Sequence, residues 1–166
     1  MFINIKRVII FITTLIILGI DQMSKNTVLS FFENNNICYH KITHFLNFVK
    51  LWNKGISFGI FCEYHLPPVL FVLISFVTVV LILCCFTNTH PVLLGIIIGG
   101  ATGNIIDRII FGKVFDFIDL HVLNYHLPIF NIADIFIIVG IIFLLIYSIE
   151  GELEKISYSC NKNLLT

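Results

Sequence analysis

No charged residue stands between Glu63 and Asp107, and this stretch limits the possible folds more than any other part of the chain. It is far longer than the roughly 20 residues with which one helix crosses about 30 Å of hydrocarbon, so we expect it to hold more than one membrane span. The interruption is "TNTHP" at 87–91, where polar residues end one helix and a proline suits the start of the next. These features predict helices over 67–86 and 91–111.

The composition is that of a membrane protein. Only 12% of the residues are charged, compared with about 25% in an ordinary soluble domain, and 58% are apolar. The sequence contains no repeat, no glycine-rich phosphate loop and no basic patch large enough for nucleic acid. We therefore expect an α-helical integral membrane protein without a nucleic-acid partner.

Two further spans are predicted near the ends of the chain. Lys6 and Arg7 precede an uncharged run, but no small-x-small cleavage site follows it, so we predict a retained helix over 8–29 rather than a removed leader. A second apolar run predicts a helix over 132–149. Four spans put both termini on one side, and the two basic residues near the N-terminus favour the cytoplasm.

These spans divide the chain into one membrane domain and a tail. Residues 1–150 would form a single four-helix domain, and 151–166 a short cytoplasmic tail. The loop over 30–66 includes "ITHFLNFVKLWNKGISFGIF", which is rich in β-branched and aromatic residues with a glycine-containing break at 53–55. We expect it to form a small extracytoplasmic β-cradle between the first and second helices.

The cysteines and histidines do not predict a metal site. Cys38 and Cys62 share a predicted compartment, but nothing in their spacing decides whether they pair. His40 and His44 stand four apart without a carboxylate in a ligand pattern, which favours a solvated pair over zinc. We expect no metal and no other cofactor.

Four acids converge at one predicted depth in the membrane. With a rise of 1.5 Å per residue, Asp21 lies roughly 20 Å into the first helix and Asp107 roughly 24 Å into the third. Asp116 follows the third helix by a short turn, and Asp134 lies in the first turn of the fourth. Carboxylates near hydrocarbon are costly unless paired or hydrated, so we expect a functional site near the outer leaflet.

Each polar group also has a structural interpretation. Asp21 and Lys25 are spaced for an ion pair along one helix face. Asn104 shares a face with Asp107 and Arg108, so a buried network that fixes the third helix is as plausible as substrate contact. A stripe of glycines at 95, 99 and 103 suits close packing against another helix.

Asp116 and Asp134 are the best candidates for chemistry. Asp116 has no cation four residues away, although it could be a solvated loop acid. Asn131 resembles an N-cap for the helix that contains Asp134, and capping alone could explain both residues. Two carboxylates held close share a proton, so that one serves as base and the other as hydrogen-bond donor, as in aspartic proteases. Because the helix dipole favours charge on Asp134, we expect Asp134 as the initial base and Asp116 as the initial acid.

Five motifs in order resemble the lipoprotein signal peptidase family, the bacterial type II signal peptidases. They span nearly the whole chain and are "DQMSK" at 21–25, "NKGISFGIF" at 53–61, "GGATGNIIDR" at 99–108, "GKVFDFID" at 112–119 and "FNIADIF" at 130–136. The resemblance implies an inner-membrane aspartic endopeptidase that removes signal peptides from diacylglyceryl-modified prolipoproteins just before the lipidated cysteine. It also implies four spans with a β-cradle and an extracytoplasmic helical segment.

The resemblance places the catalytic pair on Asp116 and Asp134. The supporting or substrate-positioning residues implied are Asp21, Lys25, Asn53, Gly100, Asn104, Asp107, Arg108 and Asn131. Ile56 and Ser57 stand where many relatives have two alanines, a change that could alter the substrate groove. The other expected partner is membrane lipid, and we expect a monomer.

Other functions compete with this interpretation. A small proton-coupled transporter would also place acids in the membrane, but it often shows a broken-helix inverted repeat, which is missing here. Other intramembrane aspartic proteases carry a Gly-x-Gly-Asp signature that this chain lacks. A purely structural membrane subunit would leave the acids unexplained.

Overall fold

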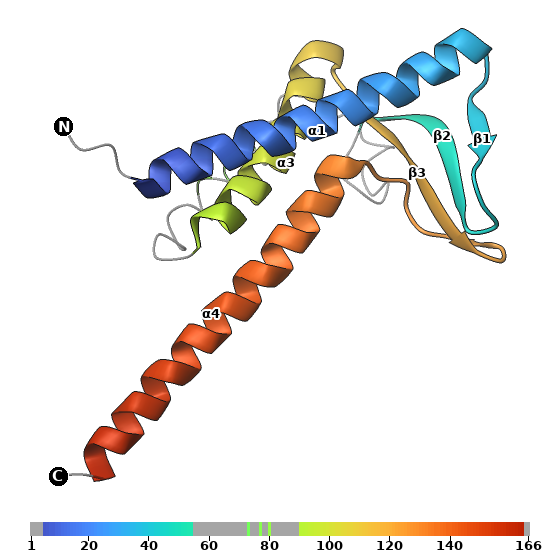
Figure 1. Cartoon of the computed structure of the whole chain (residues 1–166). Helices are drawn as coiled ribbons and strands as arrows, with labels where there is room; N and C mark the ends of the chain where they lie inside the picture. Colours follow the sequence, from blue (N-terminus) through green and yellow to red (C-terminus); the bar gives the residue numbers. More distant parts are fainter. Residues whose placement is uncertain (1–4, 55–72, 74–76, 78–79, 81–89, 165–166) are drawn as a thin grey trace.

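The computed structural model describes residues 5–54, 73, 77, 80 and 90–164 (Figure 1). Its helices are α1 (Ile5–Asn35), α3 (Pro91–Phe111) and α4 (Ile132–Leu164). Among the described residues, three helices are long and apolar enough to cross a membrane, over Ile5–Asn35, Pro91–Phe111 and Ile132–Gly151. The helix predicted over 67–86 lies outside the described residues except for three isolated positions, as do residues 55–66 of the predicted loop.

The structure confirms both predicted ends of the third helix. Each end carries a local sequence signal. Pro91 occupies the first turn of α3, and the preceding His90 is extended, with φ −67° and ψ 123°. At the other end Gly112 adopts φ 68°, a left-handed conformation that glycine tolerates, and its N–H donates to the carbonyl oxygen of Arg108. This turn sends the chain directly into the strand that carries Asp116.

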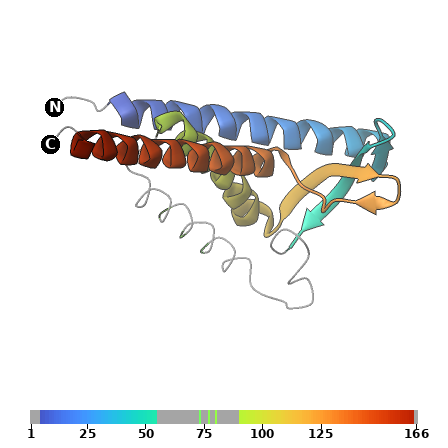
Figure 2. The same ribbon diagram turned by 90° about the horizontal axis from the view of Figure 1, so that it is seen from below.

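The first and fourth helices extend beyond their predicted ends. α1 continues past residue 29 to Asn35, and α4 continues past residue 149 to Leu164, so the predicted tail is largely helical. Figure 2 shows the start of α1 and the end of α4 at one end of the molecule and the sheet at the other.

Glycines bring α3 close to both of its neighbours. A Cβ atom at Gly95 would lie 2.6 Å from the Cβ of Thr13, and one at Gly99 would lie 2.7 Å from the Cβ of Ile17, both on α1. The predicted packing role of this stripe is confirmed. Gly140 on α4 makes the corresponding approach from the other side, against Ile97.

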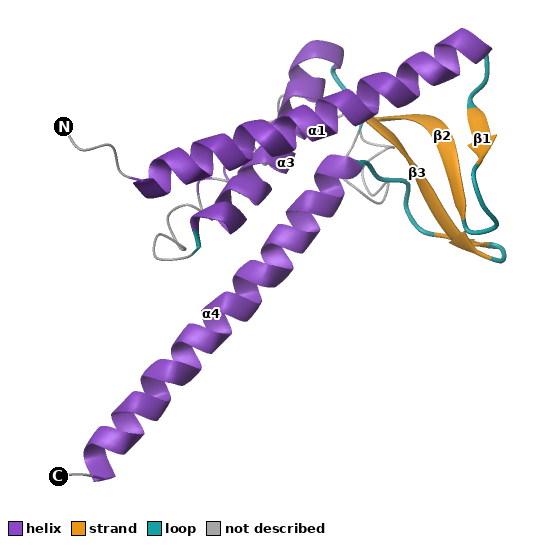
Figure 3. Ribbon diagram, viewed as in Figure 1, coloured by secondary structure: helices purple, strands orange, loops and turns teal. Residues whose placement is uncertain are grey.

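A four-stranded antiparallel sheet covers the end of the helices (Figure 3). Its order is β1 (Tyr39–Lys41), β2 (Leu46–Asn53), β3 (Val114–Val122) and β4 (Tyr125–His126). The strands predicted between the first two helices are therefore present, but the placement of the whole cradle there is wrong. Half of the sheet comes from the connection between α3 and α4, because β2 finds its partner in the distant β3.

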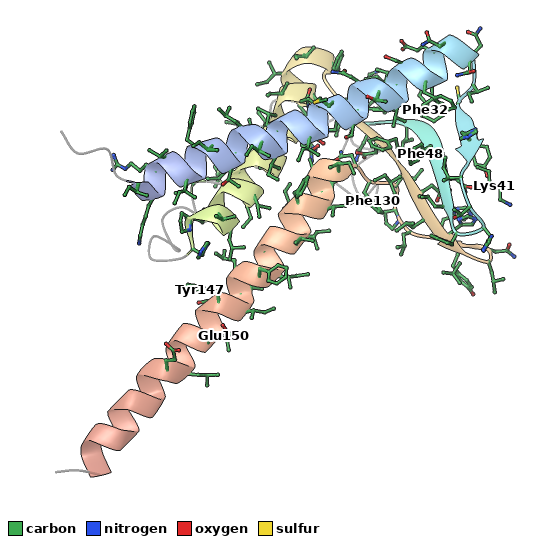
Figure 4. The ribbon with its side chains drawn as sticks, in the orientation of Figure 1. Phe32, Lys41, Phe48, Phe130, Tyr147 and Glu150 are labelled. Carbon is green, nitrogen blue, oxygen red and sulfur yellow. The ribbon has the colours of Figure 1, made fainter. Side chains whose placement is uncertain are left out.

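The sheet closes over an aromatic core at the end of α1. Phe32 is fully buried against Phe115 and Phe117 of β3, and Phe48 of β2 meets Phe117 edge to face. Figure 4 shows Phe32, Phe48 and Phe130 gathered between α1 and the strands, whereas Tyr147 and Glu150 lie out along α4. This packing fixes β3, and with it Asp116, against the helical part of the molecule.

Candidate active site

The predicted acids meet where the end of α3, the start of β3 and the start of α4 come together. Asp116 lies near the beginning of β3 and Asp134 in the first turn of α4. Among the most deeply buried side chains are Asp116, Asp21 and Asn131, although all are polar. Buried polar groups must be satisfied by hydrogen bonds or opposite charges, and the contacts described below supply both.

The carboxylate of Asp116 accepts a hydrogen bond at each oxygen. The Asn131 side-chain amide donates to Oδ1 at 2.6 Å, and that of Asn53, at the end of β2, donates to Oδ2 at 2.9 Å. Burial and the neighbouring charge of Asp134 nevertheless raise the pKa of Asp116 from 3.8 to about 6. Asp116 therefore retains a proton under mildly acidic conditions in which an ordinary aspartate has lost it.

Asp134 is held by a reciprocal cap at the start of α4. Its backbone N–H donates to Oδ1 of Asn131 at 3.1 Å, while the backbone N–H of Asn131 donates to Asp134 Oδ2 at 3.2 Å. The predicted N-cap is thus confirmed. Asn104 of α3 donates from Nδ2 to Asp134 Oδ1 at 2.9 Å. The free N–H groups of the first turn favour negative charge on Asp134.

Asn131 connects the two aspartates. Its side-chain amide donates to Asp116 and its backbone amide donates to Asp134, so both carboxylates lie within reach of a single residue. Two carboxylates this close repel each other when both are ionised, and the repulsion contributes to the raised pKa of Asp116. Such a pair can hold one shared proton and act as acid and base together.

A second network, centred on Lys25, lies next to this pair and contains most of the other predicted residues. Lys25 of α1 forms ion pairs with Asp21 at 2.8 Å and with Asp107 at 2.9 Å, and it donates to Asn104 Oδ1 at 3.0 Å. The predicted Asp21–Lys25 pair is therefore confirmed. Asp107 contacts Lys25, Gln22 and the Phe115 backbone, and in the described part of the chain it makes no hydrogen bond to Asp116 or Asp134.

Asn104 links the two networks. Its Oδ1 accepts from Lys25 and from Asn131 at 3.1 Å, while its Nδ2 donates to Asp134. Arg108, one turn further along α3, donates to the Asn104 backbone oxygen at 3.3 Å and interacts electrostatically with Asp116 and Asp134. The network centred on Lys25 can thereby set the position of the aspartate pair.

Gly100 lets α3 approach the start of α4. A Cβ atom there would lie 2.7 Å from the carbonyl oxygen of Ala133, immediately before Asp134. The backbone N–H of Ala133 in turn donates to Oδ1 of Asp21 at 3.0 Å. All ten residues predicted for the site therefore lie in one connected region.

Gln22 belongs to the network centred on Lys25 but was not among the residues predicted for the site. Its side-chain amide donates to Asp107 Oδ1 at 3.0 Å and to the Gly103 carbonyl oxygen at 3.3 Å, which ties α1 to α3. A long amide side chain inside an apolar helix was the available signal, since such a group needs a partner.

Asp119 does not join the aspartate pair, although it is only three residues from Asp116. Its Oδ2 accepts from Asn47 at 2.9 Å, and its Oδ1 lies 2.7 Å from Nδ1 of His126. An odd separation along a strand places two side chains on opposite faces of the sheet. The second acid of the "VFDFID" run therefore lies in a different environment.

Comparison with known proteins finds one family over most of the chain. The family described as signal peptidase (SPase) II matches residues 13–150. The lipoprotein signal peptidase of Rickettsia conorii is 40% identical over 152 residues, covering 87% of this chain and 74% of the relative. That of Anaplasma marginale is 32% identical over 141 residues, covering 82% of each protein.

A solved structure shares the fold. A bacterial membrane enzyme determined by the in meso method at 2.3 Å resolution superimposes with a TM-score of 0.68 and 26% sequence identity. The match covers 88% of this chain and 90% of that one. The fold is therefore shared over most of the length of both proteins.

Proposed function

This chain belongs to the signal peptidase II family, and we propose that Asp116 and Asp134 are the two carboxylates with which it hydrolyses prolipoproteins. The chain is a bacterial membrane aspartic peptidase that removes signal peptides from prolipoproteins. Family membership decides against the transporter, the alternative that the acids alone allowed.

One observation carries the assignment of the catalytic pair. Asn131 donates to a carboxylate oxygen of Asp116 and to one of Asp134, which holds the two groups together, and among the described residues no cation forms an ion pair with either carboxylate. Asp107 and Asp21, by contrast, share the ammonium group of Lys25. Acids paired with a buried lysine are poor proton acceptors, whereas two carboxylates without a direct ion pair can exchange a proton with water.

In the proposed mechanism, the ionised Asp134 takes a proton from a water molecule. At the same time the oxygen of that water attacks the carbon of the scissile peptide carbonyl. The protonated Asp116 donates a hydrogen bond to that carbonyl oxygen, where negative charge develops. A proton then passes to the amide nitrogen, the carbon–nitrogen bond breaks, and the carboxyl and amine products leave. The pair returns to its state with one shared proton.

The remaining site residues act through position and charge. Asn53 and Asn131 orient Asp116, while Asn104 orients Asp134. Lys25, Asp21 and Asp107 hold α1 and α3 in register, and Gly100 gives α4 its close approach. Arg108 adds positive charge beside the developing oxyanion.

We further propose that the substrate is diacylglyceryl-modified and that the cut falls just before the lipidated cysteine. The pair lies at the end of the spans, next to the sheet, where a lipid-anchored peptide would present its scissile bond. With Lys6 and Arg7 in the cytoplasm, both termini are cytoplasmic and the site lies near the outer leaflet of the inner membrane. The enzyme works as a monomer and without a cofactor.

The test uses two forms of one prolipoprotein, with and without the diacylglyceryl group, and protein purified in detergent. We expect cleavage of the lipidated form at the bond before the modified cysteine, found by mass spectrometry of the products. Equal cleavage of both forms would contradict the proposed lipid requirement. A cut at another bond would contradict the proposed site of hydrolysis.

A further inference from the structure

A histidine pair and an aspartate share one face of the β3–β4 hairpin. His121 and His126 are directly opposite each other in the antiparallel pairing of the two strands, so their side chains point to the same face. Asp119 lies two residues before His121 on β3, and residues two apart also share a face. The short hairpin therefore brings together three metal-binding side chains from within eight residues of sequence.

The donor atoms of this cluster lie close together. One ligand atom from each of Asp119, His121 and His126 lies within 4.8 Å of the other two. Oδ1 of Asp119 is 2.7 Å from Nδ1 of His126, and the two imidazole rings stack with centroids 4.9 Å apart. The hairpin thus holds two imidazoles and one carboxylate at nearly the separation that a shared ion requires.

The cluster also contains an unsatisfied polar atom. Nδ1 of His121 is buried, and it has no hydrogen-bond partner among the described residues. A buried ring nitrogen without a partner is costly, and an absent ion is one of the recognised explanations. Asp119 is 4% exposed and is oriented by Asn47, which donates to its other oxygen, as an outer partner orients a metal ligand.

We propose that Asp119, His121 and His126 form a binding site for a divalent transition-metal ion, Zn²⁺ in the first instance. Imidazole nitrogen and carboxylate oxygen are normal zinc ligands, and three protein ligands leave a fourth position for water. Tetrahedral bonds of about 2.0 Å require donors about 3.3 Å apart. The widest donor separation must therefore close by at most about 1.5 Å, whereas the 2.7 Å between Asp119 and His126 must open slightly. The exposed His126 on the two-residue strand β4 is the ligand best placed to move.

The site is separate from the proposed aspartate pair. Within the residues that the structure describes, none of the three ligands forms a hydrogen bond with Asp116, Asp134, Asn131 or Asn104. A bound ion would join β4 to β3, where the described backbone pairing covers only two residue pairs. The proposal therefore concerns the stability of the hairpin, and peptide hydrolysis does not depend on it.

The test measures Zn²⁺ binding to protein prepared without a histidine tag, by competition with a chromophoric chelator. We expect the wild-type chain to take up one Zn²⁺ that Asp119→Asn and His121→Phe do not. Loss of an outer partner alone weakens zinc sites 10–100-fold, so loss of a ligand should weaken binding by on the order of 100-fold or more. Asp119→Asn can keep hydrogen bonds to Asn47 and His126, so its loss of zinc reports the missing carboxylate and not misfolding.

His40→Gln is the matched control, because His40 is an exposed histidine on β1 of the same sheet and lies outside the cluster. It should bind Zn²⁺ as the wild-type chain does. Zinc should also raise the melting temperature of the wild-type and His40→Gln proteins but not of Asp119→Asn. Equal zinc uptake by the wild-type and both ligand variants would overturn the proposal, as would no uptake by the wild type. Neither result would affect the peptidase assignment.

Discussion

At the scale of single residues, Asn131 determines the geometry of the site. It begins α4 as the N-cap, and its side chain and backbone donate to different aspartates. The capping role could be predicted from "FNIAD", because an asparagine three residues before an acid is a local pattern. The contact with Asp116 could not, because it depends on where β3 lies relative to α4.

The raised pKa of Asp116 predicts an acidic pH dependence. Asp116 carries its proton below pH about 6, and the proposed mechanism needs that proton. We therefore expect kcat/KM to fall as pH rises through this value, with the apparent pKa belonging to the coupled pair. The measurement is kcat/KM on a lipidated prolipoprotein from pH 4 to 9, and a rate that only rises across pH 6 would contradict a protonated Asp116.

The same shift has a consequence for stability. The folded-state pKa of Asp116 is above its unfolded value, so protonation favours the folded chain. The stabilising contribution of Asp116 is full below pH about 4 and is lost as pH rises to about 6.

Asp107 should prove to be a structural residue. Asp107→Asn removes one of the two acids that neutralise the buried Lys25, which should cost about 1–3 kcal/mol of unfolding free energy. Folded yield should fall at least as much as turnover per folded molecule, measured by thermal unfolding and by cleavage assays on the same preparation. Glu33→Gln, which removes an exposed pair with Lys50, should change stability by about 1 kcal/mol or less. A stable but inactive Asp107→Asn protein would place this residue in the catalytic group.

At the scale of helices and strands, the sequence predicted elements best where their ends carry local signals. Pro91 and Gly112 mark α3, and its predicted bounds match the structure. α1 and α4 exceed their predicted ends because the apolar pattern stops at the edge of the hydrocarbon, while neither "SFFENN" nor "EGELEK" contains a residue that must end a helix. The pairing of β2 with β3 was missed because it joins segments far apart in the sequence.

The glycine stripe leads to a prediction about helix packing. A Cβ atom at Gly99 would lie 2.7 Å from the Cβ of Ile17 and 2.9 Å from the backbone oxygen of Thr14. Gly99→Ala should therefore force α1 and α3 apart and cost about 1–3 kcal/mol, seen as a lower melting temperature in detergent. Gly19→Ala on α1 is the control, because a Cβ atom there meets nothing within 4 Å. Equal stability of the two variants would show that the helices pack less closely than described.

At the scale of the whole molecule, the arrangement separates a sheet at one end from the outer ends of α1 and α4 at the other (Figure 2). The depth of the acids and the count of four spans were argued from sequence and stay predictions. The contact of both Asp116 and Asp134 with one asparagine could not be predicted, because it requires β3 and α4 to be placed together. The cluster of Asp119, His121 and His126 was missed for a similar reason, since "DLH" and "YH" form a ligand pattern only when the hairpin pairs them.

The proposed orientation in the membrane can be tested with Cys38, an exposed residue just before β1. In a chain with Cys38 as its sole cysteine, a membrane-impermeant maleimide added to right-side-out vesicles should react at once, because the sheet faces outward. A cysteine-free chain carrying Glu154→Cys, on the exposed part of α4, should react only after the membrane is disrupted. The reverse pattern would invert the topology and remove the site from the outer leaflet.

The central claim is that Asp116 and Asp134 together perform the hydrolysis, and cleavage of a lipidated prolipoprotein by single asparagine variants tests it most directly. Asp116→Asn and Asp134→Asn should each lose at least about 10²–10⁴-fold in turnover, the usual contribution of a general acid or base, while remaining folded. Asp119→Asn, on the same strand but outside the pair, should keep most of its activity. Near-normal cleavage by either Asp116→Asn or Asp134→Asn would contradict the account.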